Sequence, residues 1–151
     1  MRTALAATWT LLLGMALLML GAGLQGTLVG LRASLEGFPT LLAGIMLAAY
    51  YLGYMAGSVM TPPLVNSVGH VRVFAALASL ASALILLQGV FVAPLPWTLV
   101  RILMGFCFAG IYVVAESWLN GRVDNEHRGL LLSIYMLVCY GGLGLGQLLL
   151  N

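Results

Sequence analysis

The chain has 151 residues, of which 62% are hydrophobic and 7% are charged. Soluble domains carry about 25% charged residues, because their surfaces must be solvated, so this composition excludes a soluble globular protein. The basic residues are all arginine, and the net charge of +2 is too small for a nucleic-acid-binding surface. The sequence therefore predicts a polytopic membrane protein in contact with the lipid bilayer.

Five apolar stretches are each long enough to cross a bilayer core, which needs about 20 residues per helix. Pro94 and Pro96 divide one long apolar run into two spans, because proline removes a backbone donor and marks a turn. The first span is too long for a signal peptide, whose apolar region has only about 7–15 residues. We expect helices at about 6–30, 39–62, 71–92, 96–118 and 129–150. Since the loops between them are short, residues 1–151 should form one all-α domain, an antiparallel bundle of membrane helices.

The arginines predict the orientation of the chain, because basic residues near span ends are retained on the cytoplasmic side. With a cytoplasmic amino terminus, Arg2, Arg72, Arg122 and Arg128 lie inside and only Arg32 lies in an outer loop. We therefore expect a multi-pass protein of the plasma (inner) membrane with its amino terminus in the cytoplasm.

Small residues recur at intervals of four, a spacing that lets helix backbones approach each other in lipid. The predicted packing faces are Gly26 with Gly30, Gly53 with Gly57, Ala75 with Ser79 and Ala83, and Gly142 with Gly146. The glycines clustered between residues 141 and 146 would also suit a fifth helix that bends during a conformational cycle. Trp9, Trp97 and Trp118 lie near span ends and predict an interfacial aromatic belt.

Two ionisable residues lie inside the predicted spans, where a charge is costly and is usually kept for pairing or function. Arg101 and Glu116 are about 22 Å apart along one helix, so they cannot pair with each other. Arg101 fits either an arginine that reaches the outer headgroups or one that faces a polar cavity. Glu116 fits either a structural ion pair with a loop arginine or a lock that breaks and re-forms.

The sequence contains no catalytic constellation. His70 and His127 lie far apart in predicted loops, unlike the ligands of a metal cluster, and Cys107 and Cys139 lie in apolar runs as packing residues. No lysine or histidine lies in a span to activate Ser58, and a chain without lysine has no phosphate-binding loop of the usual kind. We therefore expect no enzyme, no cofactor and no metal site.

The segment 62–72 resembles the signature loop between the second and third helices of the major facilitator superfamily, a family of secondary transporters. Gly69 and Arg72 fall on family positions, whereas Asn66 stands where the family has an acid. The order and lengths of the five spans also resemble the first half of that family's fold.

A second motif of that family is similar to the predicted fourth helix and its flanks. Arg101 and Gly105 lie near the start of the helix, Glu116 lies at its end, and Arg128 precedes the next helix. The segment 115–120 is similar to a bacterial branch whose members are mostly described as transporters of unassigned substrate.

The resemblance implies a secondary active transporter that moves a small solute by alternating access. Because the first and fourth helices would line a central cavity, Gln25, Arg101 and Tyr112 become substrate or proton-pathway residues. The implied cytoplasmic gate consists of Asn66, Gly69, Arg72, Glu116 and Arg128, with Glu116 and Arg72 forming the lock. Since family members have two halves, five helices predict a truncated amino-terminal portion.

An alternative hypothesis is a five-helix membrane interaction protein without transport activity of its own. Such a protein would associate with itself, or with a second transporter half, through its small-residue faces. The substrate remains open at this stage, because half of any midplane site would come from other helices.

Overall fold

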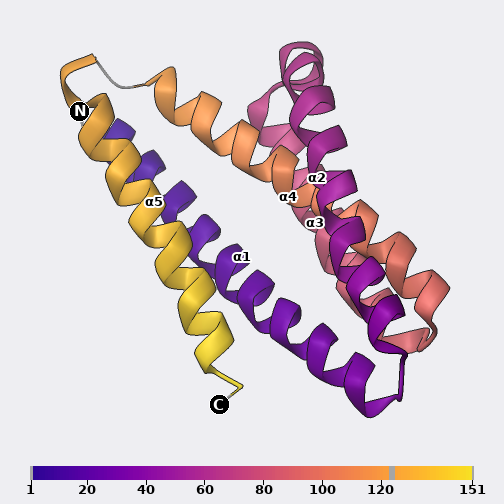
Figure 1. The fold of residues 1–151 in the computed structure, drawn as a ribbon. Helices are drawn as coiled ribbons and strands as arrows, with labels where there is room; N and C mark the ends of the chain where they lie inside the picture. Colours follow the sequence, from indigo (N-terminus) through magenta and orange to yellow (C-terminus); the bar gives the residue numbers. More distant parts are fainter. Residues whose placement is uncertain (1, 123–124, 151) are drawn as a thin grey trace. The chain divides into compact units, whose positions relative to one another are not determined.

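The computed structural model of the protein describes residues 2–122 and 125–150, with side chains for residues 8–122 and 127–150. Arg2, which contributes to the predicted orientation, has its side chain outside these residues. The described helices are α1 (Arg2–Leu35), α2 (Thr40–Val68), α3 (His70–Val90), α4 (Pro94–Asn120) and α5 (Asn125–Leu148) (Figure 1). All five are long and apolar enough to cross a membrane. The prediction of an all-α membrane protein is therefore confirmed.

Helix α2 continues beyond residue 62, where the sequence predicted its end, and reaches Val68. Pro62 and Pro63 lie inside it. Each proline removes one backbone donor, which usually bends or ends a helix. Here Thr61 and Val65, on either side of the prolines, are buried on one face. The chain stays helical through the proline pair, as membrane helices often allow.

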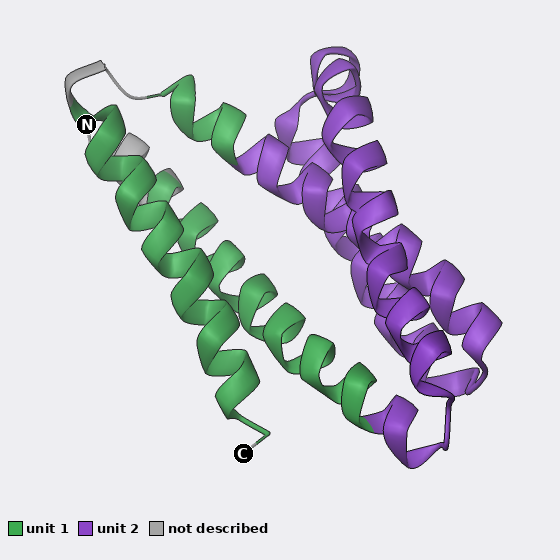
Figure 2. Ribbon diagram, viewed as in Figure 1, with its two compact units in different colours: residues 1–31, 116–151 green, residues 32–115 purple. Residues whose placement is uncertain are grey.

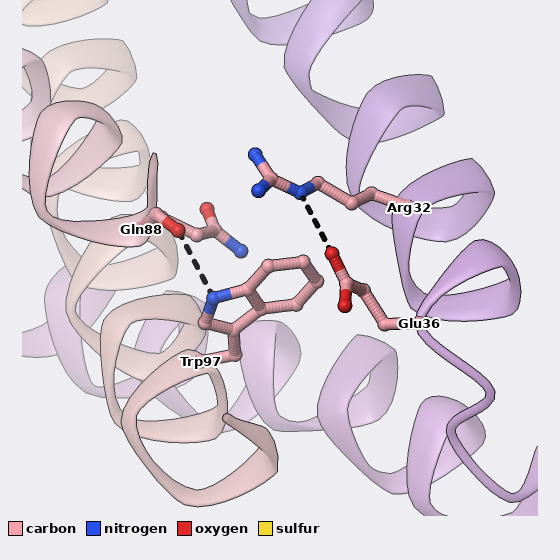
Figure 3. Close-up of polar contacts among 4 residues, drawn as sticks. All are labelled: Arg32, Glu36, Gln88 and Trp97. Atoms are coloured by element: carbon pink, nitrogen blue, oxygen red, sulfur yellow. Dashed lines mark hydrogen bonds and ion pairs between the residues drawn. The ribbon is translucent and has the colours of Figure 1, made fainter. Parts of the chain in front are cut away.

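Helices α1 and α4 extend beyond both of their predicted ends, and α5 begins at Asn125, before its predicted start. Helix α4 begins at Pro94, because both Pro94 and Pro96 fall in the first turn, where backbone donors have no partner within the helix. Helix α1 extends to Leu35. Arg32 Nε, in its last turn, forms an ion pair at 3.5 Å with Oε1 of Glu36, the residue that follows the helix (Figure 3).

The chain divides into two compact units (Figure 2). Unit 1 contains residues 1–31 and 116–151, and unit 2 contains residues 32–115. Most of α1 and all of α5 thus belong to unit 1, whereas α2, α3 and most of α4 belong to unit 2. The single five-helix domain expected from the short loops stays a prediction.

In unit 1, α1 and α5 run side by side in the same direction (Figure 1). A Cβ atom on Gly142 would meet the backbone carbonyl of Ala16, and one on Gly146 would meet the carbonyl of Leu20. The residue numbers rise together along the two helices, which establishes a parallel pair. The predicted small-residue face of the fifth helix is therefore a packing face.

In unit 2, α2 and α4 form a second parallel pair with close backbone contact. Three glycines would each place a Cβ atom against a backbone carbonyl of the other helix: Gly53 against Ile102, Gly57 against Phe106, and Gly105 against Tyr50. The closest contacts thus join parallel helices that are not consecutive, because these are the faces on which side chains are absent. The short loops alone had favoured antiparallel neighbours.

The other two predicted small-residue faces are open within the described residues. No atom lies within 4 Å of a Cβ position on Gly26 or Gly30, and Ala75, Ser79 and Ala83 are exposed. A spacing of four makes a helix face smooth, but it does not determine which face a neighbour covers.

Trp97, one of the three tryptophans of the predicted aromatic belt, lies inside unit 2 with 1% of its surface exposed. Its indole Nε1 donates a hydrogen bond to the carbonyl oxygen of Gln88 at 3.0 Å (Figure 3). Its ring meets Phe38 edge-on, with the ring centroids 5.5 Å apart. Trp9, by contrast, is 65% exposed. The indole is buried because a carbonyl at the end of α3 satisfies its one donor.

Candidate functional site

Arg101 is buried on α4, with 9% of its surface exposed. Its guanidinium carbon lies 4.8 Å from the centroid of the Tyr50 ring on α2, in cation–π contact. The two helices approach this closely because Gly105, one turn after Arg101, has no side chain and packs against the backbone of Tyr50. The guanidinium is therefore held against α2 within unit 2.

The guanidinium has donors that the described residues leave unused. Arg101 Nε is buried and has no hydrogen-bond partner among them. The ion pair found in the described part of the chain joins Arg32 and Glu36, both partly exposed. A buried cation without an anion costs several kcal/mol in principle, and its five donors favour a planar oxyanion. Arg101 is thus suited chemically to bind a carboxylate or a similar group.

Tyr50 is the first of several tyrosines whose rings lie close together. The Tyr50 and Tyr54 centroids are 6.1 Å apart, and the Tyr54 and Tyr112 centroids are 6.5 Å apart. We call Arg101, Tyr50, Tyr54 and Tyr112 the arginine–tyrosine cluster. All four residues belong to unit 2.

The cluster joins two residues that the sequence singled out with two that it did not. Arg101 and Tyr112, both predicted pathway residues, are connected through Tyr50 and Tyr54 of α2. The signal that could have found the two α2 tyrosines is their spacing of four beside Gly53. This spacing places them along the helix face that approaches α4.

Gln25, the third predicted pathway residue, lies on α1 in unit 1 and is 8% exposed. A buried side-chain amide needs hydrogen-bond partners that lipid cannot supply. The structure therefore brings Arg101 and Tyr112 together in one unit and places Gln25 in the other. A shared role for the three residues stays a prediction.

Gly69 forms the turn between α2 and α3. Its φ angle is 97°, a conformation that favours glycine, and its amide donates to the carbonyl of Val65 at 2.9 Å. Asn66 and Arg72 lie on either side of this turn and are exposed. Three predicted gate residues thus gather around one sharp turn.

The other two predicted gate residues, Glu116 and Arg128, belong to unit 1. Arg128 Nη2 donates to the carbonyl oxygen of Asn120 at 3.3 Å, which ties the start of α5 to the end of α4. Glu116 is partly buried near the end of α4. Arg72 lies in unit 2, so the predicted lock between Glu116 and Arg72 stays a prediction.

Comparison with known proteins decides the family. The sequence model described as Major Facilitator Superfamily matches residues 4–150. The chain belongs to the major facilitator superfamily. It is 34% identical over 141 residues to the uncharacterized MFS-type transporter YcaD of Salmonella arizonae. It is 33% identical over 141 residues to an uncharacterized MFS-type transporter of Enterobacter sp. (strain 638).

Each of these alignments covers 93% of the facilitator chain and 37% of the relative. The chain thus spans somewhat more than a third of the length of the curated relatives it matches. No solved structure matches it significantly. The family assignment confirms the resemblance seen in the sequence and supports a multi-pass membrane protein of a transporter family. Proteins of this family are generally transporters and not enzymes.

Cys107 and Cys139 of the facilitator chain are buried and form no disulfide. Among the side chains that the structure describes, no group of three or more histidine, cysteine or acidic residues is placed to hold a metal ion. The buried polar contacts of unit 2 include the arginine–tyrosine cluster and the Trp97–Gln88 hydrogen bond.

Proposed function

We propose that the facilitator chain forms part of a secondary active transporter that moves a small solute by alternating access. The observation that best supports this function is the arginine–tyrosine cluster, a buried cation on a membrane-spanning helix beside a row of aromatic rings. A charge held in a membrane span at this energetic cost is normally kept for function or for pairing.

Specific residues carry the proposed roles. Gln25, Arg101 and Tyr112 line the substrate or proton pathway. The turn around Gly69, with its flanking side chains, the end of α4 and the start of α5 contribute the residues of the cytoplasmic gate: Asn66, Gly69, Arg72, Glu116 and Arg128. We place the protein in the plasma (inner) membrane, and the arginine distribution favours an amino terminus in the cytoplasm. Its function is transport, with no enzymatic reaction and no cofactor.

Alternating access needs two bodies that rock around a site near the membrane midplane. The chain covers 37% of the length of its transporter relatives. We therefore propose that transport requires a second transporter half in addition to these five helices.

Uptake into proteoliposomes tests this function. The chain alone and the chain joined to the remaining part of YcaD are reconstituted and supplied with a panel of labelled organic anions, amino acids and sugars. The joined protein should show saturable uptake of at least one solute, and the chain alone should show none. Equal uptake by the two proteins would contradict the need for a second half.

In the joined protein, Arg101→Ala should lower the initial uptake rate by about tenfold or more, because a charge-assisted contact is lost. Membrane abundance should change little. Arg32→Ala is the matched control, since this arginine is partly exposed and its ion pair contributes little. Parallel loss of uptake and abundance in Arg101→Ala would show that the residue is needed only for folding.

A further inference from the structure

We propose that the arginine–tyrosine cluster binds an aromatic carboxylate, with the carboxylate on Arg101 and the ring against Tyr54 and Tyr112. This inference rests on the proposed function and names the substrate class of the same site. The argument for the carboxylate and the argument for the ring depend on different contacts.

The unpaired donor of Arg101 is the reason for proposing a ligand with a carboxylate. The guanidinium carbon lies 4.8 Å from the centroid of the Tyr50 ring, so the ring covers a face of the guanidinium and does not accept from its in-plane N–H groups. One of them, Nε, is buried and without a partner among the described residues. A carboxylate can accept hydrogen bonds from Nε and a terminal nitrogen at once, the two-point geometry that arginine favours.

The charge of the ligand follows from the composition of the cluster. Arg101 is its one cationic side chain, and its other members are uncharged tyrosines. A monoanion neutralises this buried charge. A neutral solute leaves the cation uncompensated, and a dianion adds an uncompensated negative charge in an apolar span.

The tyrosines of the cluster are the reason for proposing a ligand with an aromatic ring. The Tyr50 and Tyr54 rings are inclined by 35°, and the Tyr54 and Tyr112 rings by 59°. These rings form a tilted series and are not stacked flat on one another. Tyr50, Tyr54 and Tyr112 each keep part of their surface accessible. A flat ring can therefore add to the series in an edge-on or offset arrangement, which aromatic pairs prefer.

Calorimetric titration of the purified 151-residue chain in lipid nanodiscs tests the proposal, with benzoate as the probe. Empty nanodiscs correct for partition of the probe into lipid. Benzoate should bind saturably, several-fold more tightly than cyclohexanecarboxylate, because only benzoate makes ring contacts. Benzylamine, which has the ring but carries a positive charge, should not bind. Absence of benzoate binding would overturn the proposal, since all four residues of the cluster lie in this chain.

Variants separate the two parts of the site. Arg101→Gln should weaken benzoate binding by about tenfold or more, and Arg101→Lys should weaken it less, because lysine keeps the charge but not the planar donors. Tyr54→Leu should remove the preference for benzoate over cyclohexanecarboxylate, whereas Tyr54→Phe should keep it. Tyr140→Leu is the control, an exposed tyrosine on α5.

Two further results would overturn the assignment. Undiminished benzoate binding by Arg101→Gln would exclude the carboxylate anchor, and equal affinity of the unaltered chain for benzoate and cyclohexanecarboxylate would exclude the ring site. Helical content by circular dichroism confirms that each variant is folded, and the conservative variants Arg101→Lys and Tyr54→Phe test the same contacts with little change in packing.

The failure of this inference differs from the failure of the transport proposal. Uptake of a neutral solute by the joined protein, without benzoate binding, would reject the substrate class and keep transport. Benzoate binding without uptake of any solute would reject transport and keep the binding site.

Discussion

Trp97 is a buried side chain whose contribution to the stability of unit 2 can be measured. Its Nε1 donates to the carbonyl of Gln88 in the last turn of α3, where helix carbonyls lack partners within the helix. Trp97→Phe keeps an aromatic ring but removes the N–H group that donates to that carbonyl. We expect a loss of about 1 kcal/mol in the free energy of unfolding, because a buried hydrogen bond is removed. Unfolding by sodium dodecyl sulfate in mixed micelles, followed by circular dichroism, measures this loss.

Trp9→Phe is the matched control for this residue. Trp9 is 65% exposed, and surface substitutions change stability by about 0.5 kcal/mol or less. An equal loss in the two variants would mean that the hydrogen bond to Gln88 contributes nothing specific.

At the scale of helices, glycines determine which faces touch. A Cβ atom on Gly53 would collide with the backbone of Ile102, whereas one on Gly44 of the same helix would meet nothing within 4 Å. Gly53→Ala should therefore separate α2 from α4 and lower the free energy of unfolding by about 1–3 kcal/mol. Gly44→Ala should be neutral or should stabilise the protein by up to about 1 kcal/mol, because alanine favours helix. The same micelle titration compares the two variants.

A loss of stability in Gly44→Ala as large as that in Gly53→Ala would contradict the close contact between α2 and α4. The glycines of α5 divide in a similar way. Gly142 and Gly146 pack against α1, whereas Gly141 and Gly144 have open Cβ positions. Packing thus explains two of these four glycines, and bending of α5 remains a hypothesis for the other two.

At the scale of the whole molecule, orientation in the membrane can be tested with introduced cysteines. Ser34, near the end of α1, and Ser67, near the end of α2, are both exposed. With the amino terminus in the cytoplasm, a membrane-impermeant maleimide should label Ser34→Cys in intact cells. It should label Ser67→Cys only after the cells are permeabilised, because basic residues retain that turn inside.

The native cysteines Cys107 and Cys139 are buried and should give little background in this labelling. The unaltered chain measures that background directly. Labelling of Ser67→Cys but not Ser34→Cys in intact cells would reverse the proposed orientation.

The sequence by itself determined that this protein lies in a lipid bilayer, how many helices cross it and which family it belongs to. In apolar runs of bilayer length, a helix satisfies the backbone N–H and C=O groups within the lipid. Arg101 stands out in such a run because its charge is costly there. These are local properties of the chain, so they can be read without knowing which residues meet.

Only the tertiary structure decided which side chains and which helices contact each other. Tyr50 and Tyr54 join Arg101 to Tyr112 only because Gly53, Gly57 and Gly105 let α2 and α4 run together. Buried Trp97 donates its indole hydrogen to the carbonyl of Gln88 and packs against Phe38, contacts that the sequence alone does not reveal. Lipid provides no hydrophobic drive between helices, so their pairing depends on detailed fit between faces that look equally smooth in the sequence.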